Sequence, residues 1–250
     1  MSQELLNRPD VAQATLQGPH GTLPFCLFKT DACFQIANDI FAGITYPIVP
    51  VVSDVKTVLD IGANVGAATF YYAMAYPDAQ IYSLEPGSSP LSLLHQNIAS
   101  LRNVKVFPFG LHCSERTVTL FHGKKDSVES SLSSSLRTSS ESEQIRLVGA
   151  SQFLSDHGID KVDVMKIDTE GCEVPILRSL KSYLPEVKVL YVEYHSERDR
   201  RLIDGILAET HVLWRGHVNL AYRGEFCYLK RELVPGETET HTCEILMNLE

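Results

Sequence analysis

Short apolar runs and longer amphipathic patterns alternate along the middle of the chain. The runs are rich in β-branched and aromatic residues, which favours strands, and they cover residues 57–61, 80–84, 104–109, 162–167 and 187–192. Between them, hydrophobic residues recur at spacings of three and four, which predicts helices over about 65–75, 90–101, 173–184 and 197–209. Strands that alternate with helices are typical of a parallel sheet with crossover helices. We therefore predict a doubly wound α/β fold.

The chain changes character on both sides of this region. We expect residues 1–56 to form helices and one short strand, GTLPFCLF, as an extension that packs on a domain of residues 57–250. After residue 209, three strand-like runs follow without helices between them: HVLW, EFCYLKREL and CEILMNL. They predict an antiparallel ending to a mostly parallel, seven-stranded sheet. Residues 123–142 are Ser-rich and polar, which favours a mobile surface loop over a lid on a ligand cleft.

Composition and charge argue against several classes of protein. The chain has 250 residues, 44% of them hydrophobic and 21% charged, which suits a globular domain with a sizeable core. The net charge of −9 argues against a nucleic-acid partner, because that binding relies on Lys and Arg at phosphates. Near the N-terminus there is no signal-peptide pattern, and the run ITYPIVPVV is too short to span a membrane. Six cysteines without a C-x-x-C pair favour reduced thiols in a cytoplasmic protein.

A glycine-rich turn follows the first predicted strand. It reads Asp60-Ile-Gly-Ala-Asn-Val-Gly66, and its two glycines, Gly62 and Gly66, allow a tight bend and a close approach to a ligand. The next helix offers unpaired N–H groups to an anionic group such as a carboxylate. Asp60 could bind the ammonium of an amino-acid moiety, either directly or through water. The turn therefore predicts a site for a ligand that carries an amino-acid group.

Glu85 lies nineteen residues beyond Gly66, at the end of the second predicted strand. A carboxylate there can accept hydrogen bonds from both hydroxyls of an adenosine ribose. The turn reads G-x-x-x-G and lacks the third glycine of the nicotinamide pattern G-x-G-x-x-G. Adenosine with an amino-acid tail fits better than a pyrophosphate; the alternative is a plain structural turn beside a solvated Glu85. The adenine is expected at the end of the third strand, near Gly110 and Leu111.

The fourth and fifth predicted strands both end in polar residues. KIDTEGCE (166–173) follows the fourth strand, and EYH (193–195) follows the fifth. Asp168 and Glu193 occupy equivalent strand ends, where ligands of open α/β sheets bind, so both are expected to face one cleft. If the ligand of this cleft reacts through an alcohol group, Asp168 or His195 could remove the proton of that hydroxyl. Alternatively, Asp168, Glu193 and His195 hold a divalent ion such as Mg²⁺ that lowers the pKa of the hydroxyl.

With these residues in place, the sequence resembles the FkbM-type methyltransferases. The matching pieces keep their order over about residues 30–200: VLDIGANVG, the Glu85-Pro86 pair, Asn97, KIDTEGCE and YVEYH. The resemblance implies a class I methyltransferase fold, S-adenosylmethionine as donor and S-adenosylhomocysteine as product. Together with the strand-end argument, it predicts cofactor contacts at Asp60, Gly62, Ala63, Asn64, Gly66, Glu85, Pro86, Gly110 and Leu111. The predicted catalytic residues are Asp168, Glu170, Glu193 and His195.

The resemblance also implies a type of acceptor. Members of the family typically methylate hydroxyl groups of sugars or secondary metabolites, so we expect a small-molecule or glycosylated acceptor, with a homo-oligomer as an open option. Two other readings are kept. One is a catalytically silent module that retains the fold and binds a partner protein. The other is a nicotinamide-linked oxidoreductase, which the missing third glycine disfavours.

Overall fold

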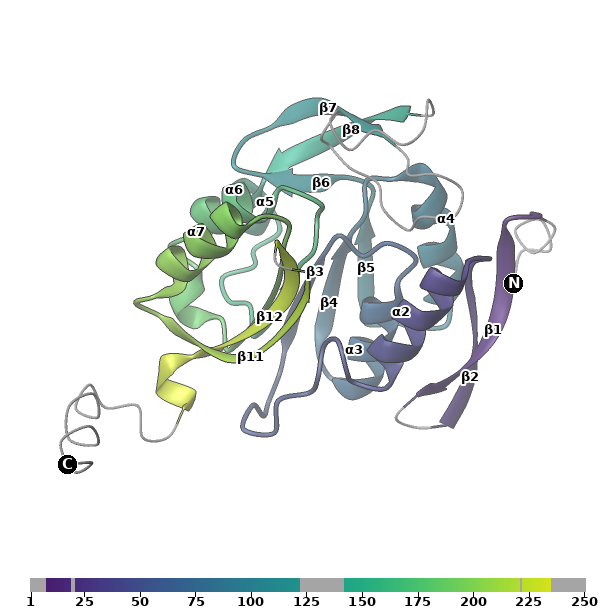
Figure 1. The fold of residues 1–250 in the computed structure, drawn as a ribbon, viewed down its shortest axis with the longest axis horizontal. Coiled ribbons are helices and arrows are strands. Elements are labelled where there is room, and N and C mark those ends of the chain that lie inside the picture. The colour runs from purple at the N-terminus through teal and green to yellow at the C-terminus, as the bar shows by residue number, and fades with distance from the viewer. Residues whose placement is uncertain (1–7, 19–20, 122–141, 221, 235–250) are drawn as a thin grey trace.

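The computed structural model describes residues 8–18, 21–121, 142–220 and 222–234. Its central sheet has seven strands in this part of the chain (Figure 1). From one edge to the other they are β11 (His211–Leu220), β12 (Arg223–Lys230), β10 (Val189–Tyr194), β9 (Val164–Ile167), β3 (Thr57–Ile61), β4 (Gln80–Leu84) and β5 (Val104–Phe107). Neighbours pair in parallel except at β12, which is antiparallel to β10 and to β11. The predicted mostly parallel sheet with an antiparallel C-terminal strand is confirmed.

Helices cover both faces of this sheet (Figure 1). One hydrophobic cluster joins the sheet to α5 (Ala150–Asp156), α6 (Glu173–Ser179) and α7 (Glu197–Leu207), and another joins it to α2 (Asp31–Phe41) and α3 (Ala67–Ala75). The remaining described helical elements are α4 (Ser88–Asn97) and two 3₁₀ turns, η2 (Leu184–Glu186) and η3 (Arg231–Leu233). Within the described ranges, no helix has both the length and the apolar character needed to cross a membrane.

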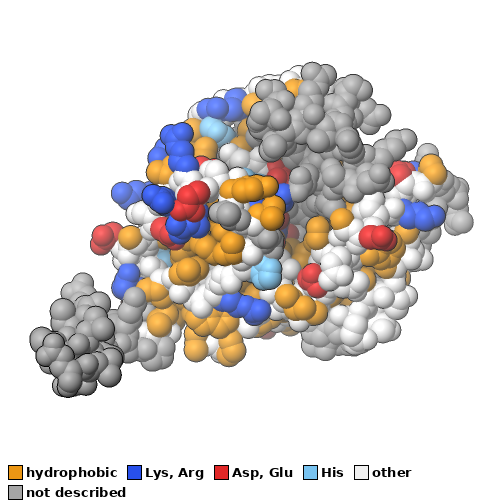
Figure 2. Space-filling model, viewed as in Figure 1, with side chains coloured by type: hydrophobic (Ala, Val, Ile, Leu, Met, Phe, Trp, Pro, Cys, Tyr) orange, Lys and Arg blue, Asp and Glu red, His pale blue; other side chains and the backbone are white. Residues whose placement is uncertain are grey.

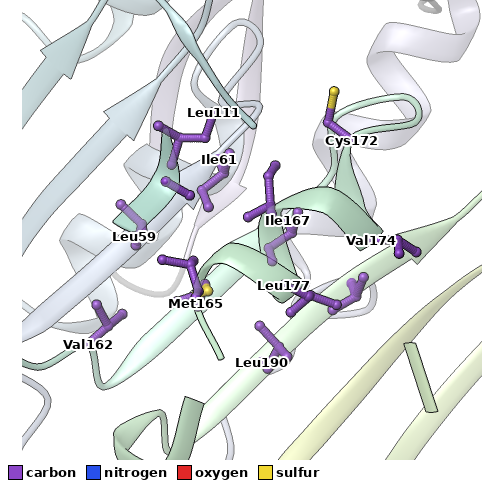
Figure 3. Close-up of a cluster of buried hydrophobic side chains, with 14 of the residues drawn as sticks. Leu59, Ile61, Leu111, Val162, Met165, Ile167, Cys172, Val174, Leu177 and Leu190 are labelled. Atoms are coloured by element: carbon purple, nitrogen blue, oxygen red, sulfur yellow. The ribbon is translucent and has the colours of Figure 1, made fainter. Parts of the chain in front are cut away.

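Side chains alternate between the two faces of the central strands, as the two-residue period of a strand requires. Figure 3 shows part of the first cluster, to which β3, β9 and β10 contribute Leu59, Ile61, Met165, Ile167 and Leu190. Asp60 lies between Leu59 and Ile61, and Lys166 lies between Met165 and Ile167. Both polar side chains are therefore directed to the opposite face, which is the face covered by α2 and α3. The alternation thus places charged groups at the strand ends on one side of the sheet.

The N-terminal residues share a core with the sheet. A hairpin of β1 (Val11–Gly18) and β2 (Gly21–Phe28) precedes α2, where the sequence predicted a single strand. The side chain of Asn97 in α4 joins this hairpin to the glycine turn. It donates to the carbonyls of Cys26 and Val65 at 2.8 Å each and accepts from the N–H of Cys26 at 2.8 Å. The boundary at residues 56 and 57 stays a prediction.

A second sheet of three described strands follows β5 along the chain. It consists of β6 (Gly110–His112), β7 (Arg116–Phe121) and β8 (Ser142–Gly149), in the order β6-β8-β7. Leu111, Leu120 and Leu147 from these strands are buried in the cluster of α5 and α6. The sequence did not predict this sheet. The Ser-rich segment up to residue 141 and the predicted strand CEILMNL fall outside the described residues.

His211, at the start of β11, gives the fold a measurable dependence on pH. Its side chain is 3% exposed, its Nε2 lies 3.0 Å from the carbonyl of Val187, and burial lowers its pKa from 6.5 to about 4. Because the unfolded chain binds this proton more tightly, the neutral His211 stabilises the fold fully above pH 6.5. That contribution, about 3 kcal/mol, is lost as the pH falls from 6.5 to 4.

We therefore expect His211→Gln to flatten the dependence of the free energy of unfolding on pH between 6.5 and 4. Urea denaturation at a series of pH values measures it, with His95→Gln on the exposed part of α4 as the control. A wild-type slope that survives in His211→Gln would show that other groups cause it.

Candidate active site

The glycine turn connects the carboxyl end of β3, a central strand, to the start of α3. Gly62 and Gly66 have φ values of 83° and 88°, in the left-handed region that favours glycine, and Asn64 between them has 49°. The N–H groups of Gly62 and Ala63 donate to the carbonyl of Leu84 at 3.0 and 2.9 Å. A Cβ on Gly62 would lie 1.8 Å from the carbonyl oxygen of Asp168. The backbone of this turn is therefore held against both β4 and the end of β9.

Glu85 follows β4 and closes the other side of the turn. Its side chain accepts from the N–H of Asn64 through Oε2 and from the N–H of Gly87 through Oε1, both at 2.8 Å. Glu85 is 7% exposed, and this burial raises its pKa to about 7. The two backbone donors fix the position of the carboxylate, and each oxygen keeps a lone pair for a further donor. A ligand hydroxyl can therefore bind there without rearranging the turn.

Asp60 and Lys166 form a buried ion pair behind the turn. Lys166 Nζ lies 3.2 Å from Asp60 Oδ1 and donates to the carbonyl of Gly62 at 2.8 Å, while Thr69 donates to Asp60 Oδ2 at 2.6 Å. Burial opposes the charge on Lys166, but Asp60 and Asp168 raise its pKa. Because Asp60 is 0% exposed, its carboxylate does not reach a surface where a ligand could contact it directly. Its carboxylate instead fixes the ammonium that holds the turn.

Asp168 lies just beyond the end of β9, with its side chain 29% exposed. Its Oδ2 is 3.5 Å from Lys166 Nζ and accepts a hydrogen bond from the hydroxyl of Tyr46 at 3.1 Å. Burial would raise the pKa of Asp168, but the charges of Lys166 and His195 and the hydrogen bond from Tyr46 lower it to about 2. Asp168 is therefore a fixed negative charge at neutral pH. Sequence reasoning missed Tyr46, which reaches the site from before the first βα unit.

Glu170, Glu193 and His195 form a second polar group, next to Asp168. One ligand atom from each of the three lies within 4.8 Å of the others. His195 Nε2 is 2.9 Å from Glu170 Oε2 and 3.3 Å from Glu193 Oε2. The sequence predicted Asp168 as the third member of this group; the structure instead brings in Glu170, whose left-handed φ of 54° places it after the strand end. Asp168 contacts Lys166 and Tyr46 instead.

Arg223, at the start of β12, binds the outer oxygens of the same two carboxylates. Its Nε lies 2.7 Å from Glu193 Oε1, and its Nη2 lies 3.3 Å from Glu170 Oε1.

The charges around Glu193 and His195 shift the pKa values of both side chains. Burial and the charge of Asp168 raise the pKa of Glu193 to about 8; burial would lower the pKa of His195, but Glu170, Glu173 and Glu193 raise it to about 12. The role of His195 as a base, which the sequence suggested, stays a prediction.

Glu173 has a structural role at the start of α6. Its Oε1 accepts from the N–H of Thr169 at 2.9 Å and, at 3.2 Å, from the N–H of Gly171. Its charge also lies in the first turn of the helix, where negative charge is favourable. Glu173 therefore holds the loop between β9 and α6.

The predicted adenine side is packed more tightly than the sequence indicated. Leu111 is 1% exposed and belongs to the hydrophobic core, so its side chain faces away from a ligand. A Cβ on Gly110 would lie 2.6 Å from the end of the Leu147 side chain and 3.5 Å from Pro86, so this position is closely packed. Only the backbone of Gly110 and Leu111 and the exposed part of Pro86 are available for contact. These three cofactor assignments stay predictions.

A parallel sheet with one antiparallel strand inserted near its edge, a glycine turn after β3 and a carboxylate after β4 together define a class I methyltransferase fold. The chain belongs to the FkbM methyltransferase family, because the model of the Methyltransferase FkbM domain matches residues 60–216. The family expected from the sequence is thereby confirmed.

Individual relatives are more distant. The chain is 26% identical to 2-O-methyltransferase NoeI of Sinorhizobium fredii over 60% of this chain and 66% of that protein. It is 23% identical to the 31-O-demethyl-FK506 methyltransferase FkbM of Streptomyces tacrolimicus, over 64% and 71%. It is 26% identical to AMB antimetabolite synthetase AmbE of Pseudomonas aeruginosa over 57% of this chain but only 8% of that protein. The chain thus spans less than two thirds of the length of some relatives.

Solved structures of methyltransferases are similar at low identity. A precorrin-6y C5,15-methyltransferase from Geobacter metallireducens superimposes with a TM-score of 0.44 at 13% identity, covering 72% of this chain and 82% of that one. An rRNA methylase from Streptococcus thermophilus gives a TM-score of 0.44 at 10% identity, covering 72% and 89%.

Proposed function

We propose that the chain transfers the methyl group of S-adenosylmethionine to a hydroxyl of a sugar or a small secondary metabolite. One observation carries the proposal: Glu85 is fixed by the backbone of the glycine turn with lone pairs left for a ribose diol. The α3 N-terminus beside it begins at Gly66 without a side-chain cap, which leaves N–H groups for a carboxylate. The named activities of NoeI and FkbM, both O-methyltransferases, support a hydroxyl acceptor.

The residues at the strand ends would align the acceptor. S-adenosylmethionine, when bound, would supply a methyl group on a sulfonium, from which a neutral thioether leaves. Asp168, held ionised by Lys166, would accept the hydrogen bond of the acceptor hydroxyl and direct its oxygen to that methyl. A carboxylate at the site would accept the proton that the acceptor hydroxyl loses when it is methylated. The work of the protein is orientation and the exclusion of water.

A divalent cation fits the second polar group, and we include it in the proposal. His195 Nε2 lies 2.9 and 3.3 Å from two carboxylate oxygens yet makes no aligned hydrogen bond within the described residues. Such separations are those of neighbouring ligands around one small ion. Arg223 binds the other oxygen of each carboxylate and would orient both ligands. The ion would be held by Glu170, Glu193 and His195, and it would lower the pKa of an acceptor hydroxyl.

Metal binding is tested without an acceptor. We expect Mn²⁺, followed by electron paramagnetic resonance, to bind the wild type and to bind Glu170→Gln at least tenfold more weakly, because a ligand with charge is lost. Glu209→Gln, at an exposed position after α7, is the control for the same change of charge. Equal Mn²⁺ binding in Glu170→Gln, or none in the wild type, would leave these residues as an ion-pair network only.

The proposal extends to location and partners. The five described cysteines are unpaired, four of them buried, which supports the proposed cytoplasmic location. The net charge of −9 supports a small or glycosylated acceptor over a nucleic acid. Self-association is kept open in this proposal.

Calorimetry with the reaction product separates the proposal from its rivals. S-adenosylhomocysteine is expected to bind and to raise the melting temperature, whereas NADH does neither. Glu85→Gln is expected to weaken this binding about tenfold or more, because a charged acceptor of two ribose hydroxyls is lost. Glu209→Gln should match the wild type. A silent binding module predicts no heat with S-adenosylhomocysteine, and selective binding of NADH would favour an oxidoreductase.

A further inference from the structure

A small cavity lies next to the Tyr46–Asp168 contact. The segment of residues 44–47 forms one wall, and the β11–β12 hairpin forms the other. Its polar and aromatic lining comes from Tyr46, Tyr191, Arg215, His217 and Glu225. Hydrophobic side chains gather over β11 and β12 on the outer surface (Figure 2), whereas the inner lining carries charged and hydroxyl groups. Ile44, Pro47 and Phe226 complete the lining, which therefore suits a ligand that carries hydroxyl groups on a carbon frame.

Three of these residues, Tyr46, His217 and Glu225, lie outside the segment that matches the family model. Tyr46 precedes residues 60–216 and Glu225 follows them. Tyr46 donates its hydrogen bond to Asp168, the residue proposed to orient the acceptor hydroxyl. Glu225 is the cross-strand partner of Glu193 on β10 and of His217 on β11. Tyr46 and Glu225 therefore border the proposed transfer site from parts of the chain that the family match does not include.

Glu225 has an unused capacity to accept hydrogen bonds. Within the described residues its carboxylate accepts none, although it is partly buried. Burial and the nearby charge of Asp168 both raise the pKa of Glu225, so its negative charge is incompletely stabilised. A ligand that brings O–H donors to both carboxylates would stabilise their negative charges.

We propose that Glu225 determines acceptor specificity by accepting a hydrogen bond from a second hydroxyl, next to the hydroxyl that Asp168 orients. The inference rests on the proposed methyl transfer and adds a requirement to it: the acceptor carries two neighbouring hydroxyl groups. A site with a buried polar acceptor discriminates strongly against analogues that lack the matching hydroxyl.

The test uses labelled S-adenosylmethionine with three probes. Trans-1,2-cyclohexanediol and methyl β-D-glucopyranoside carry neighbouring hydroxyls, and cyclohexanol carries one. In the wild type we expect kcat/KM for the diol and the glycoside to exceed that for cyclohexanol about tenfold or more. Glu225→Ala should reduce this ratio toward one, mainly through KM of the diol. Glu225→Gln, which keeps a carbonyl acceptor, should restore part of it.

The controls distinguish an error in the role of Glu225 from an error in the proposed methyl transfer. Glu209→Ala should keep the wild-type ratio, and S-adenosylhomocysteine should bind all variants with wild-type affinity, because Glu85 and the glycine turn are unchanged in them. If the product binds but cyclohexanol is methylated as well as the diol, or the ratio is unchanged in Glu225→Ala, the role of Glu225 is wrong. The role of Glu225 is also wrong if the wild type binds S-adenosylhomocysteine but methylates neither the diol nor the glycoside. A wild type that does not bind the product overturns the proposed function itself.

Discussion

Asp168→Asn is expected to lower the rate of methyl transfer about a hundredfold, while the affinity for S-adenosylhomocysteine stays within about twofold of the wild type. Asparagine has nearly the shape of aspartate and can still accept from Tyr46, so the site keeps its geometry. It lacks the negative charge that Lys166 stabilises at this position. The proposed hydrogen bond that draws the acceptor proton is thereby weakened. Single-turnover kinetics with labelled donor measures the chemical step directly.

The control for this substitution is Asp160→Asn, at an exposed position before β9. It makes the same change in net charge and should leave the rate unaltered. An Asp168→Asn protein with the wild-type rate would remove Asp168 from the chemistry. A large loss of product affinity would instead show that Asp168 holds the cofactor.

Gly62→Ala is expected to destabilise the fold by about 3 kcal/mol or more and to abolish cofactor binding. The methyl group would lie 1.8 Å from the backbone oxygen of Asp168, which cannot move without separating β3 from β9. From the sequence alone, a larger side chain at Gly62 is expected to block the cofactor and leave the sheet folded. The structure contradicts that expectation, because the clash is with the protein backbone.

Gly158→Ala is the matched control. Gly158 also has a positive φ, 62°, but a Cβ there would meet nothing within 4 Å. It reports the conformational cost alone, about 1 kcal/mol. Urea denaturation of both variants isolates the steric part as their difference. Equal stability of Gly62→Ala and Gly158→Ala would show that the turn has room for a side chain.

The fold was largely predictable because hydrophobic periodicity reports the environment of each strand. TVLDI and VMKI are apolar with one charged residue each, Asp60 and Lys166. Both of these side chains point to the sheet face that α2 and α3 cover. The same pattern placed Asp168 and Glu193 at neighbouring strand ends, which the structure confirms through the pairing of β9 with β10. Strand ends in a parallel sheet share one edge, so this part of the site follows from order along the chain.

Other parts of the site depend on contacts that periodicity does not encode. Tyr46 and Arg223 come from opposite ends of the chain, and only the packed structure brings them to Asp168 and Glu193. Glu170 replaced Asp168 in the group with His195 because of a left-handed backbone residue, which the sequence KIDTEG does not signal for a glutamate. The β6-β8-β7 sheet was missed because its strands are half exposed and interrupted by the Ser-rich segment.

A crystal structure of the complex with S-adenosylhomocysteine tests most directly whether the glycine turn and Glu85 form the cofactor site. The ribose hydroxyls are predicted to bind Glu85, the amino-acid tail to lie against the turn at residues 62–66, and the sulfur to face Asp168. Electron density for the ligand elsewhere, or a turn left untouched in a protein that binds the product in solution, would contradict this account.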